Sequence, residues 1–348
     1  MKSFKIMVAA AMTAGSLSFL TSCDHKDLCW DHEGHALRYK VDIQAEYSRV
    51  WEWTQPGETD WKATWPKDFG FAYDSLTPGL PKGLRATVYY GEGNSNINNL
   101  PTMGGEIALA NGENDILFYN NDTEYIVFSD MGDVATAMAT TRTRTRPSYK
   151  GSPMLIPSRS DQDATVAMPD MLYGSSLLGY VPQKTLAPVP IKISMTPLVF
   201  TYYVRCEFKH GIQYVALARG AMAGMAAGVS IYSGQTTNER ATVIFDCDIE
   251  GFGTQAFVRT FGVPDFPNDH YGSRGDKTYG LNIEVRLKNG KIKSFDIDIT
   301  DQMRRQPQGG VIIARGLEVT DEEGMQGGEG FQVDVEDWGE FEDVPLDL

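Results

Sequence analysis

The sequence predicts an all-β protein made of two tandem β-sandwiches, and three observations lead to this fold class. Short segments with alternating apolar and polar residues recur along the chain, and the stretches between them are rich in Gly, Asn and Pro. These features are typical of strands and turns. No segment of the first half keeps a helical period. Because the strands fall into two successive sets, we expect two sandwich domains with a boundary near residue 185.

The first 22 residues have the pattern of an export signal. Lys2 and Lys5 precede an apolar run without charged side chains, which lasts until Asp24. Serines, threonines and a glycine interrupt the run, so it is too short and too polar for a membrane span of about 20 apolar residues. The end of the run, Leu20-Thr21-Ser22-Cys23, resembles the lipobox of bacterial lipoproteins. We therefore expect cleavage between Ser22 and Cys23 and attachment to outer-membrane lipid through acyl chains on Cys23.

Residues 23–35 are expected to form an acidic tether. Their acids, at positions 24, 27, 31 and 33, resemble the surface-export signals of Bacteroidota lipoproteins, which indicates a surface-exposed lipoprotein of the outer membrane. The spacing of His25, Cys29, His32 and His35 would also let a flexible loop surround a metal. We favour solvated side chains here and predict no metal site.

The predicted N-terminal domain, residues 36–185, contains five clear strand patterns. They cover residues 36–47, 84–91, 105–110, 115–120 and 124–129. From about residue 130 to 164 the pattern dissolves into a long segment that contains four arginines and three prolines. Such a segment suits an exposed loop, which a trypsin-like protease could reach.

The predicted C-terminal domain, residues 186–348, starts with a strand pattern at 188–208. Further strands are expected at 212–218, 241–249, 252–261, 281–287, 292–299, 309–316 and 331–337. Asn289-Gly290 joins two of these runs and predicts a two-residue type I′ hairpin turn. The glycine-interrupted segment 218–234 is expected to be a short helix or a closely packed loop.

The charge and the cysteines restrict the partners and the redox state. The chain has 31 basic and 46 acidic residues and a formal charge of −15, so we expect neither nucleic acid nor an anionic membrane surface as a partner, because both would repel it. Cys206 and Cys247 each alternate with apolar residues, so both thiols should point inward. They either form a disulfide in an oxidising compartment or remain two buried thiols.

No pattern in the sequence indicates catalysis. Three of the five histidines lie in the tether, and neither a hydrolase motif nor a phosphate-binding loop is present. We therefore predict no enzyme, no catalytic residues and no cofactor.

Four tryptophans, Trp51, Trp53, Trp61 and Trp65, lie within fifteen positions, which leaves two interpretations open. Either they form an exposed platform that stacks on sugars, or their indoles are buried in a loop folded over a sandwich; we favour burial.

Three segments together resemble a known family. They are "CDHKDLCWDH", "MGGEIALANGENDILFYNNDTEYIVF" and "GMAAGVSIYSG", and the likeness covers nearly all of the mature chain. They are similar to the fimbrillin-like outer-membrane lipoproteins of Bacteroidota, which are grouped with fimbrial subunits. The resemblance implies transthyretin-like sandwiches and a fimbrial subunit, anchor or adhesin that acts in attachment or surface assembly.

The resemblance also implies a route of assembly. Fimbrillins are cut after an arginine by a trypsin-like protease, which removes the first strand, and a strand of the next subunit fills the groove. Here the first strand would be residues 36–47 and Arg49 the candidate cut site, with Arg38 placed less well. Other fimbrial subunits and surface glycans or proteins of hosts or microbes are the expected partners. An uncut anchor or stand-alone adhesin fits equally well, and a glycan-binding lipoprotein of a polysaccharide-uptake system is the alternative.

Overall fold

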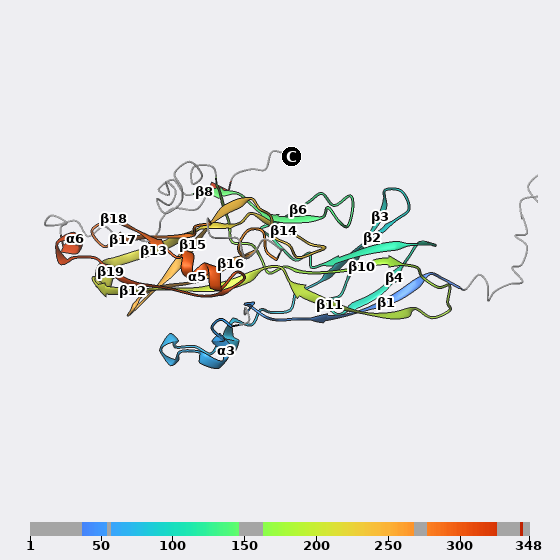
Figure 1. Cartoon of the computed structure of the whole chain (residues 1–348), viewed down its shortest axis with the longest axis horizontal. Helices are drawn as coiled ribbons and strands as arrows, with labels where there is room; N and C mark the ends of the chain where they lie inside the picture. The colour runs from blue at the N-terminus through green and yellow to red at the C-terminus, as the bar shows by residue number, and fades with distance from the viewer. Residues whose placement is uncertain (1–36, 54–56, 146–162, 268–276, 326–341, 344–348) are drawn as a thin grey trace, which may run out of the picture.

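Strands dominate the described part of the chain, and the predicted all-β fold class is confirmed. The computed structural model describes residues 37–53, 57–145, 163–267, 277–325 and 342–343. Two large sheets lie end to end along the long axis of the molecule (Figure 1). Within the described residues, no helix is long and apolar enough to cross a membrane.

The first sheet has seven strands and is curled. In spatial order they are β3 (Asn94–Leu100), β2 (Leu84–Tyr90), β5 (Asn114–Tyr119), β10 (Tyr173–Tyr180), β11 (Val189–Pro197), β1 (Lys40–Tyr47) and β4 (Gly104–Ala108). β3 and β4 stand at opposite ends of this order, yet only residues 101–103 connect them. The sheet must therefore curl, and it encloses an apolar core that includes Ile43, Val88, Phe118 and Met195.

The second sheet has eight strands. In spatial order the main path is β18 (Ile292–Asp298), β17 (Gly280–Leu287), β13 (Val215–Ala226), β15 (Arg240–Glu250), β16 (Gly253–Thr260), β12 (Phe200–His210) and β19 (Gly310–Glu318). The eighth strand, β9 (Ala164–Val166), pairs with β15. The inner face buries the largest apolar cluster of the described chain, which includes Tyr202, Phe245 and Ile283.

Short strands connect the two sheets. β14 (Gly228–Ser230), β7 (Met138–Thr141) and β6 (Ile126–Ser129) form a three-stranded sheet, and β20 (Glu342–Asp343) pairs with β8 (Arg144–Thr145). A separate apolar cluster at this junction joins residues of both halves, such as Tyr119, Leu198 and Phe261. The domain boundary near residue 185 stays a prediction. β11 follows this boundary in the sequence, yet it pairs with β1 and so belongs to the first sheet.

Helices are few and short in the part of the chain that the structure describes. They are α3 (Trp61–Thr64), α5 (Thr300–Arg305), α6 (Asp321–Met325) and the 3₁₀ turns η1 (Lys67–Phe69), η2 (Tyr73–Leu76) and η3 (Ile212–Tyr214). The small-residue segment that was expected to be a helix or a loop is largely the strand β13, so that expectation was wrong. Its small residues let neighbouring rings approach the backbone: a Cβ on Gly220 would lie 2.2 Å from the ring of Phe245.

The predicted hairpin at Asn289-Gly290 exists, but its turn is of another type. β17 and β18 pair antiparallel on either side of it. Gly290 has a φ of +84°, whereas Asn289 is not among the residues with positive φ. The amide of Gly290 donates to the carbonyl of Leu287, and the amide of Leu287 donates to Lys291. This is the three-residue hairpin loop that ends in a left-handed glycine, and not a type I′ turn.

The disulfide between Cys206 and Cys247 is contradicted by the sheet order. Cys206 lies on β12 and Cys247 on β15, and β16 stands between these two strands. Strands two apart are separated by about 9.5 Å, which exceeds the reach of a disulfide. The inward orientation is confirmed, because Cys206 belongs to the core and Cys247 packs against it. No disulfide joins Cys206 and Cys247 in the structure.

Candidate functional site

The first strand, β1, is an internal strand of its sheet. It pairs in parallel with β11 on one side and antiparallel with β4 on the other. Its inward side chains, Val41, Ile43 and Ala45, are at most 2% exposed. Ile107 of β4 and Ile193 of β11 belong to the same apolar cluster. Removal of β1 would thus open a groove with an apolar floor and unpaired strands on both sides, which another strand could fill.

Gly104 allows β1 and β4 to pair closely. Its φ is +106°, a conformation that side chains rarely adopt, and a Cβ there would lie 1.8 Å from the carbonyl oxygen of Ile43. The pairing of β1 therefore depends on the absence of a side chain at this position.

Arg49 lies in the connection from the first sheet to the second. Residues 48–50 are exposed and belong to no strand, and the amide of Ser48 still bonds to Met195 of β11. The Nε of Arg49 donates a 2.7 Å hydrogen bond to the carbonyl of Pro78. Two residues later the carbonyl of Trp51 accepts from Thr201 of β12. The candidate cut site thus has an exposed backbone between two anchored points, as protease sites require.

Arg38 has a different environment. It forms an antiparallel bridge with Thr185, with amide-to-carbonyl hydrogen bonds of 3.0 and 3.1 Å in the two directions. A protease would have to break this bridge first. The structure therefore favours Arg49 over Arg38 as the accessible arginine.

The segment after Arg49 covers the outer face of the second sheet. Trp51 and Phe69 are buried against Tyr203 of β12 and Val311 of β19, in a cluster of their own. This explains why β12 is buried on both faces although its sequence alternates. Arg205, on the same face, lies with its guanidinium 3.6 Å from the ring centre of Phe252 and forms a 2.8 Å ion pair with Glu207.

Trp65 is the centre of this cover. Its ring centre lies 6.0 Å from that of Trp51, 5.0 Å from Phe69 and 5.5 Å from Tyr73, each with the rings steeply inclined. Its Nε1 donates to the carbonyl of Phe71 at 2.7 Å. Edge-to-face packing of this kind stabilises aromatic clusters beyond the burial of their area.

The four tryptophans do not form one exposed platform. Trp51 is 1% exposed, and Trp61 and Trp65 are partly buried. Trp53 is 39% exposed, and its ring packs against that of Phe266 with 5.2 Å between the ring centres. The Nε1 of Trp61 donates to Gln306 at 2.8 Å. The arrangement agrees with the favoured interpretation, in which the indoles belong to a loop folded over a sandwich.

A buried carboxyl group lies inside the cover. Glu52 is 6% exposed and accepts a hydrogen bond from the hydroxyl of Tyr73. Burial raises its pKa to about 7, and the bond from Tyr73 opposes part of that rise. The same burial and the nearby carboxylate raise the pKa of Tyr73 above its ordinary value.

Side chains of α5 and of the residue that follows it, Gln306, cover part of the outer edge of β19. Gln302 bonds to the amide and the carbonyl of Ile313, and Gln306 bonds to those of Val311, at 2.6–3.0 Å. The two amide side chains thus take the place of a neighbouring strand. At Val311 and Ile313 the edge is therefore not available for pairing with another chain.

Several predicted sites lie outside the described residues. They are Ser22 and Cys23, and the tether with Cys29 and its histidines. In the described ranges no group of three or more His, Cys, Asp or Glu side chains is arranged to hold a metal.

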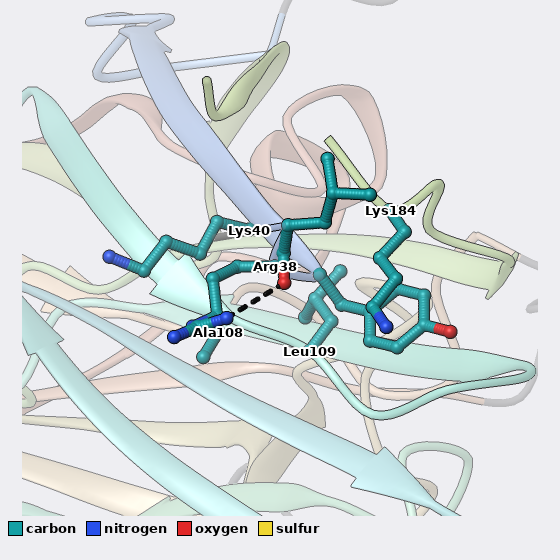
Figure 2. A pocket seen from close by; sticks show the side chains of 7 residues that line it. Arg38, Lys40, Ala108, Leu109 and Lys184 are labelled. Carbon is teal, nitrogen blue, oxygen red and sulfur yellow. Dashed lines mark hydrogen bonds between the residues drawn. The ribbon is translucent and has the colours of Figure 1, made fainter. Parts of the chain in front are cut away.

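One basic cluster, at the start of β1, was not predicted from the sequence. Arg38, Lys40 and Lys184 surround a hollow there (Figure 2). Lys184 is distant in sequence, so only the parallel pairing of β1 and β11 could have indicated that the three cations are neighbours.

The chain is similar to one described family and to several solved structures. A family model described as "Domain of unknown function (DUF5119)" matches residues 69–246, just over half of the chain. No curated protein matches the sequence. A candidate adhesin from Bacteroides ovatus superposes with a TM-score of 0.57 at 20% identity, over 86% of this chain and 98% of that one. This likeness shows a shared fold over nearly the whole of both chains.

Two other solved structures are less similar. The fimbrial anchor protein Mfa2 from Porphyromonas gingivalis gives a TM-score of 0.38 at 10% identity, over 79% of this chain and 90% of its own. A candidate polysaccharide-binding protein from Bacteroides thetaiotaomicron gives 0.44 at 9% identity, with the same two coverages.

Proposed function

The chain belongs to the family described as "Domain of unknown function (DUF5119)", and from this starting point we propose a fimbrillin-like role at the cell surface. The protein is a lipoprotein, anchored in the outer membrane through Cys23, and acts as a fimbrial subunit, a fimbrial anchor or an adhesin. The lipobox at residues 20–23 supports the anchor. The fold shared with a candidate adhesin is compatible with this role.

The observation that carries the proposal is the position of β1 relative to Arg49. β1 is an internal strand with a fully buried face, and the exposed arginine follows it by two residues. A cut after Arg49 would separate the lipid and β1 from the rest of the chain. The groove between β11 and β4 would then accept a strand from a neighbouring subunit.

The uncut form has a different role. With β1 in place the groove is filled, and Gln302 and Gln306 cover the edge of β19 at Val311 and Ile313. Such a molecule stays on the lipid as an anchor or a stand-alone adhesin. Its partners are other fimbrial subunits, or glycans and proteins of a neighbouring surface.

The alternative, a glycan-binding lipoprotein, has less support. Its expected platform required four accessible indoles, and Trp51 is buried while Trp61 and Trp65 are engaged in hydrogen bonds and ring contacts. We therefore retain the fimbrillin-like role as the proposal.

Mass spectrometry of the mature N-terminus, isolated from cell envelopes, tests anchor and cleavage together. A polymerising subunit should begin at Val50 and run as a ladder in unheated gels. An anchor or adhesin should begin at acylated Cys23 and run as one band. A mature chain that begins at neither of these residues would contradict the proposal.

Two arginine variants identify the cut site. Arg49→Gln should abolish the start at Val50 and preserve the acylated N-terminus. Arg38→Gln is the matched control and should leave processing unchanged. A start at Val50 that persists in the Arg49→Gln protein would exclude an arginine-specific protease at this position.

A further inference from the structure

The hollow at the start of β1 combines cations with an apolar floor. It has a volume of about 590 Å³, and Tyr39, Ala108 and Leu109 contribute to its lining. Figure 2 shows the side chains of Arg38, Lys40 and Lys184 around it. All three are exposed. The formal charge of −15 predicts that the chain as a whole is repelled by an anionic membrane, so attraction to one requires a local group of cations such as this.

The two lysines of this cluster are only weakly neutralised by their neighbours. Lys40 pairs with Glu106 at 3.5 Å, but both side chains are about half exposed, so the pair contributes little to stability. The ammonium of Lys184 lies 5.9 Å from the ring centre of Tyr39 and has no carboxylate partner among the described residues. The charge of Lys184 is thus available to an external anion, and Lys40 can exchange its weak partner Glu106 for one.

Exposed aliphatic side chains flank the same cations. Val181 is 59% exposed and Leu186 69%, and both lie in the connection between β10 and β11 that also holds Lys184. The bridge between Arg38 and Thr185 places this connection beside the start of β1. Cations interspersed with exposed aliphatic residues are typical of surfaces that rest on anionic membranes, where charges meet phosphates and apolar side chains enter the interface.

The position of this surface agrees with the proposed anchor. Leu37, the first described residue, follows Cys23 by 14 positions, which an extended chain spans in at most about 50 Å. The start of β1 lies at the end of the first sheet that is distant from the second sheet (Figure 1). Acylation at Cys23 would therefore keep this end closer to the lipid than the other end.

We propose that Arg38, Lys40 and Lys184, with Val181 and Leu186, form a docking surface for the phosphate-bearing anionic lipid layer beneath the protein. The inference rests on the proposed lipid anchor. Docking through this end orients the long axis away from the membrane and presents the second sheet outward. A cut after Arg49 would remove Arg38 and Lys40 together with the lipid, so the same event would release both attachments.

Vesicle co-sedimentation of the unacylated mature chain, with Cys23→Ser, tests the surface independently of the anchor. The chain should bind vesicles of phosphatidylcholine mixed with phosphatidylglycerol and not phosphatidylcholine alone, and salt should weaken the binding. Each cation near an anionic surface contributes roughly fivefold to affinity. The triple variant Arg38→Gln, Lys40→Gln, Lys184→Gln should thus lose roughly a hundredfold.

A matched triple variant at the opposite end controls for net charge. Lys209, Lys288 and Lys291 are exposed, lie at ends of β12, β17 and β18, and form no ion pair among the described residues. Their change to Gln should leave vesicle binding nearly unchanged. Leu186→Ser should weaken binding without a change in charge. Equal losses in the two triple variants would overturn the proposal.

Two further results distinguish a membrane-docking surface from a site for small anions. Inorganic phosphate, compared with chloride at equal ionic strength, should not displace the chain from vesicles. Displacement by phosphate alone would make the cluster a small-anion site and overturn the membrane proposal. A missing acyl group on Cys23 in cells would contradict the anchor but not vesicle binding, so the two failures are distinguishable.

Discussion

The hydroxyl of Tyr73 donates a 2.9 Å hydrogen bond to Oε1 of Glu52 inside the aromatic cover of the second sheet. Because burial raises the pKa of Glu52 from 4.5 to about 7, the folded chain retains this proton where the unfolded chain has released it. Stability should therefore fall as the pH rises from about 4.5 to about 7, and stay level above that range. The total effect is on the order of 3 kcal/mol.

Glu52→Gln should remove this pH dependence, because the amide stays neutral. Urea unfolding at pH 5 and pH 8 measures the difference. The exposed Glu46→Gln variant is the control and should keep the dependence of the natural chain. An equal free energy of unfolding at both pH values in the natural chain would contradict the prediction.

Gly104→Ala should loosen β1 from β4. The new Cβ would meet the carbonyl of Ile43, so we expect a loss of roughly 3 kcal/mol or more, together with faster trypsin cleavage after Arg49. Gly112 has a similar φ of +102° with nothing within 4 Å of its Cβ, so Gly112→Ala should lose only about 1–2 kcal/mol. Thermal unfolding and N-terminal sequencing of the fragments measure both effects. Equal losses in the two variants would mean that the close approach of β1 and β4 is unimportant.

Gln302→Ala combined with Gln306→Ala should uncover the edge of β19. The change leaves the amides and carbonyls of Val311 and Ile313 without their partners, at about 1 kcal/mol for each lost bond. We expect lower stability and concentration-dependent self-association, measured by light scattering. Gln235→Ala, at an exposed position outside the strands, should change neither. A monomeric double variant would show that the edge needs no cover.

Cys206 should resist alkylation in the folded protein. Burial raises the pKa of its thiol to about 12, so almost no reactive thiolate exists at pH 8. Mass spectrometry of the peptide that contains Cys206 should find it unmodified before unfolding and alkylated afterwards. A peptide linked to Cys247 would contradict the strand order of the second sheet.

Strands with strong alternation were predicted well from the sequence. Residues 84–91, 115–120 and 281–287 agree with β2, β5 and β17 within one residue at each end. In these segments every second side chain is buried, so the apolar pattern of the sequence directly predicts which residues form the core. β3 was missed, because its sequence NSNINNL has the composition of a turn and its side chains face mainly solvent. It is a strand because all seven positions pair with β2.

Features that depend on distant segments could not be predicted. β12 alternates as a half-buried strand, yet the segment that contains Trp65 and Phe69 covers its polar face. The small residues of β13 have the composition of a loop. Their place in a strand follows only from the packing of distant side chains, such as the ring of Phe245 against Gly220. The cysteines seemed able to pair because alternation predicts the face on which a residue lies but not the order of the strands. The neighbours of Arg49 likewise depend on Pro78, nearly thirty residues away.

The central position of β1 determines how the protein would respond to a mechanical load. A pull on the N-terminal end enters the fold at the bridge between Arg38 and Thr185 and runs along the axis of β1, across the direction of its hydrogen bonds to β11 and β4. The bonds on both sides then share the force and must break together, whereas an edge strand pulled sideways would lose them one by one. A molecule held at this end against flow would therefore resist unfolding most strongly at the point where the tension is applied.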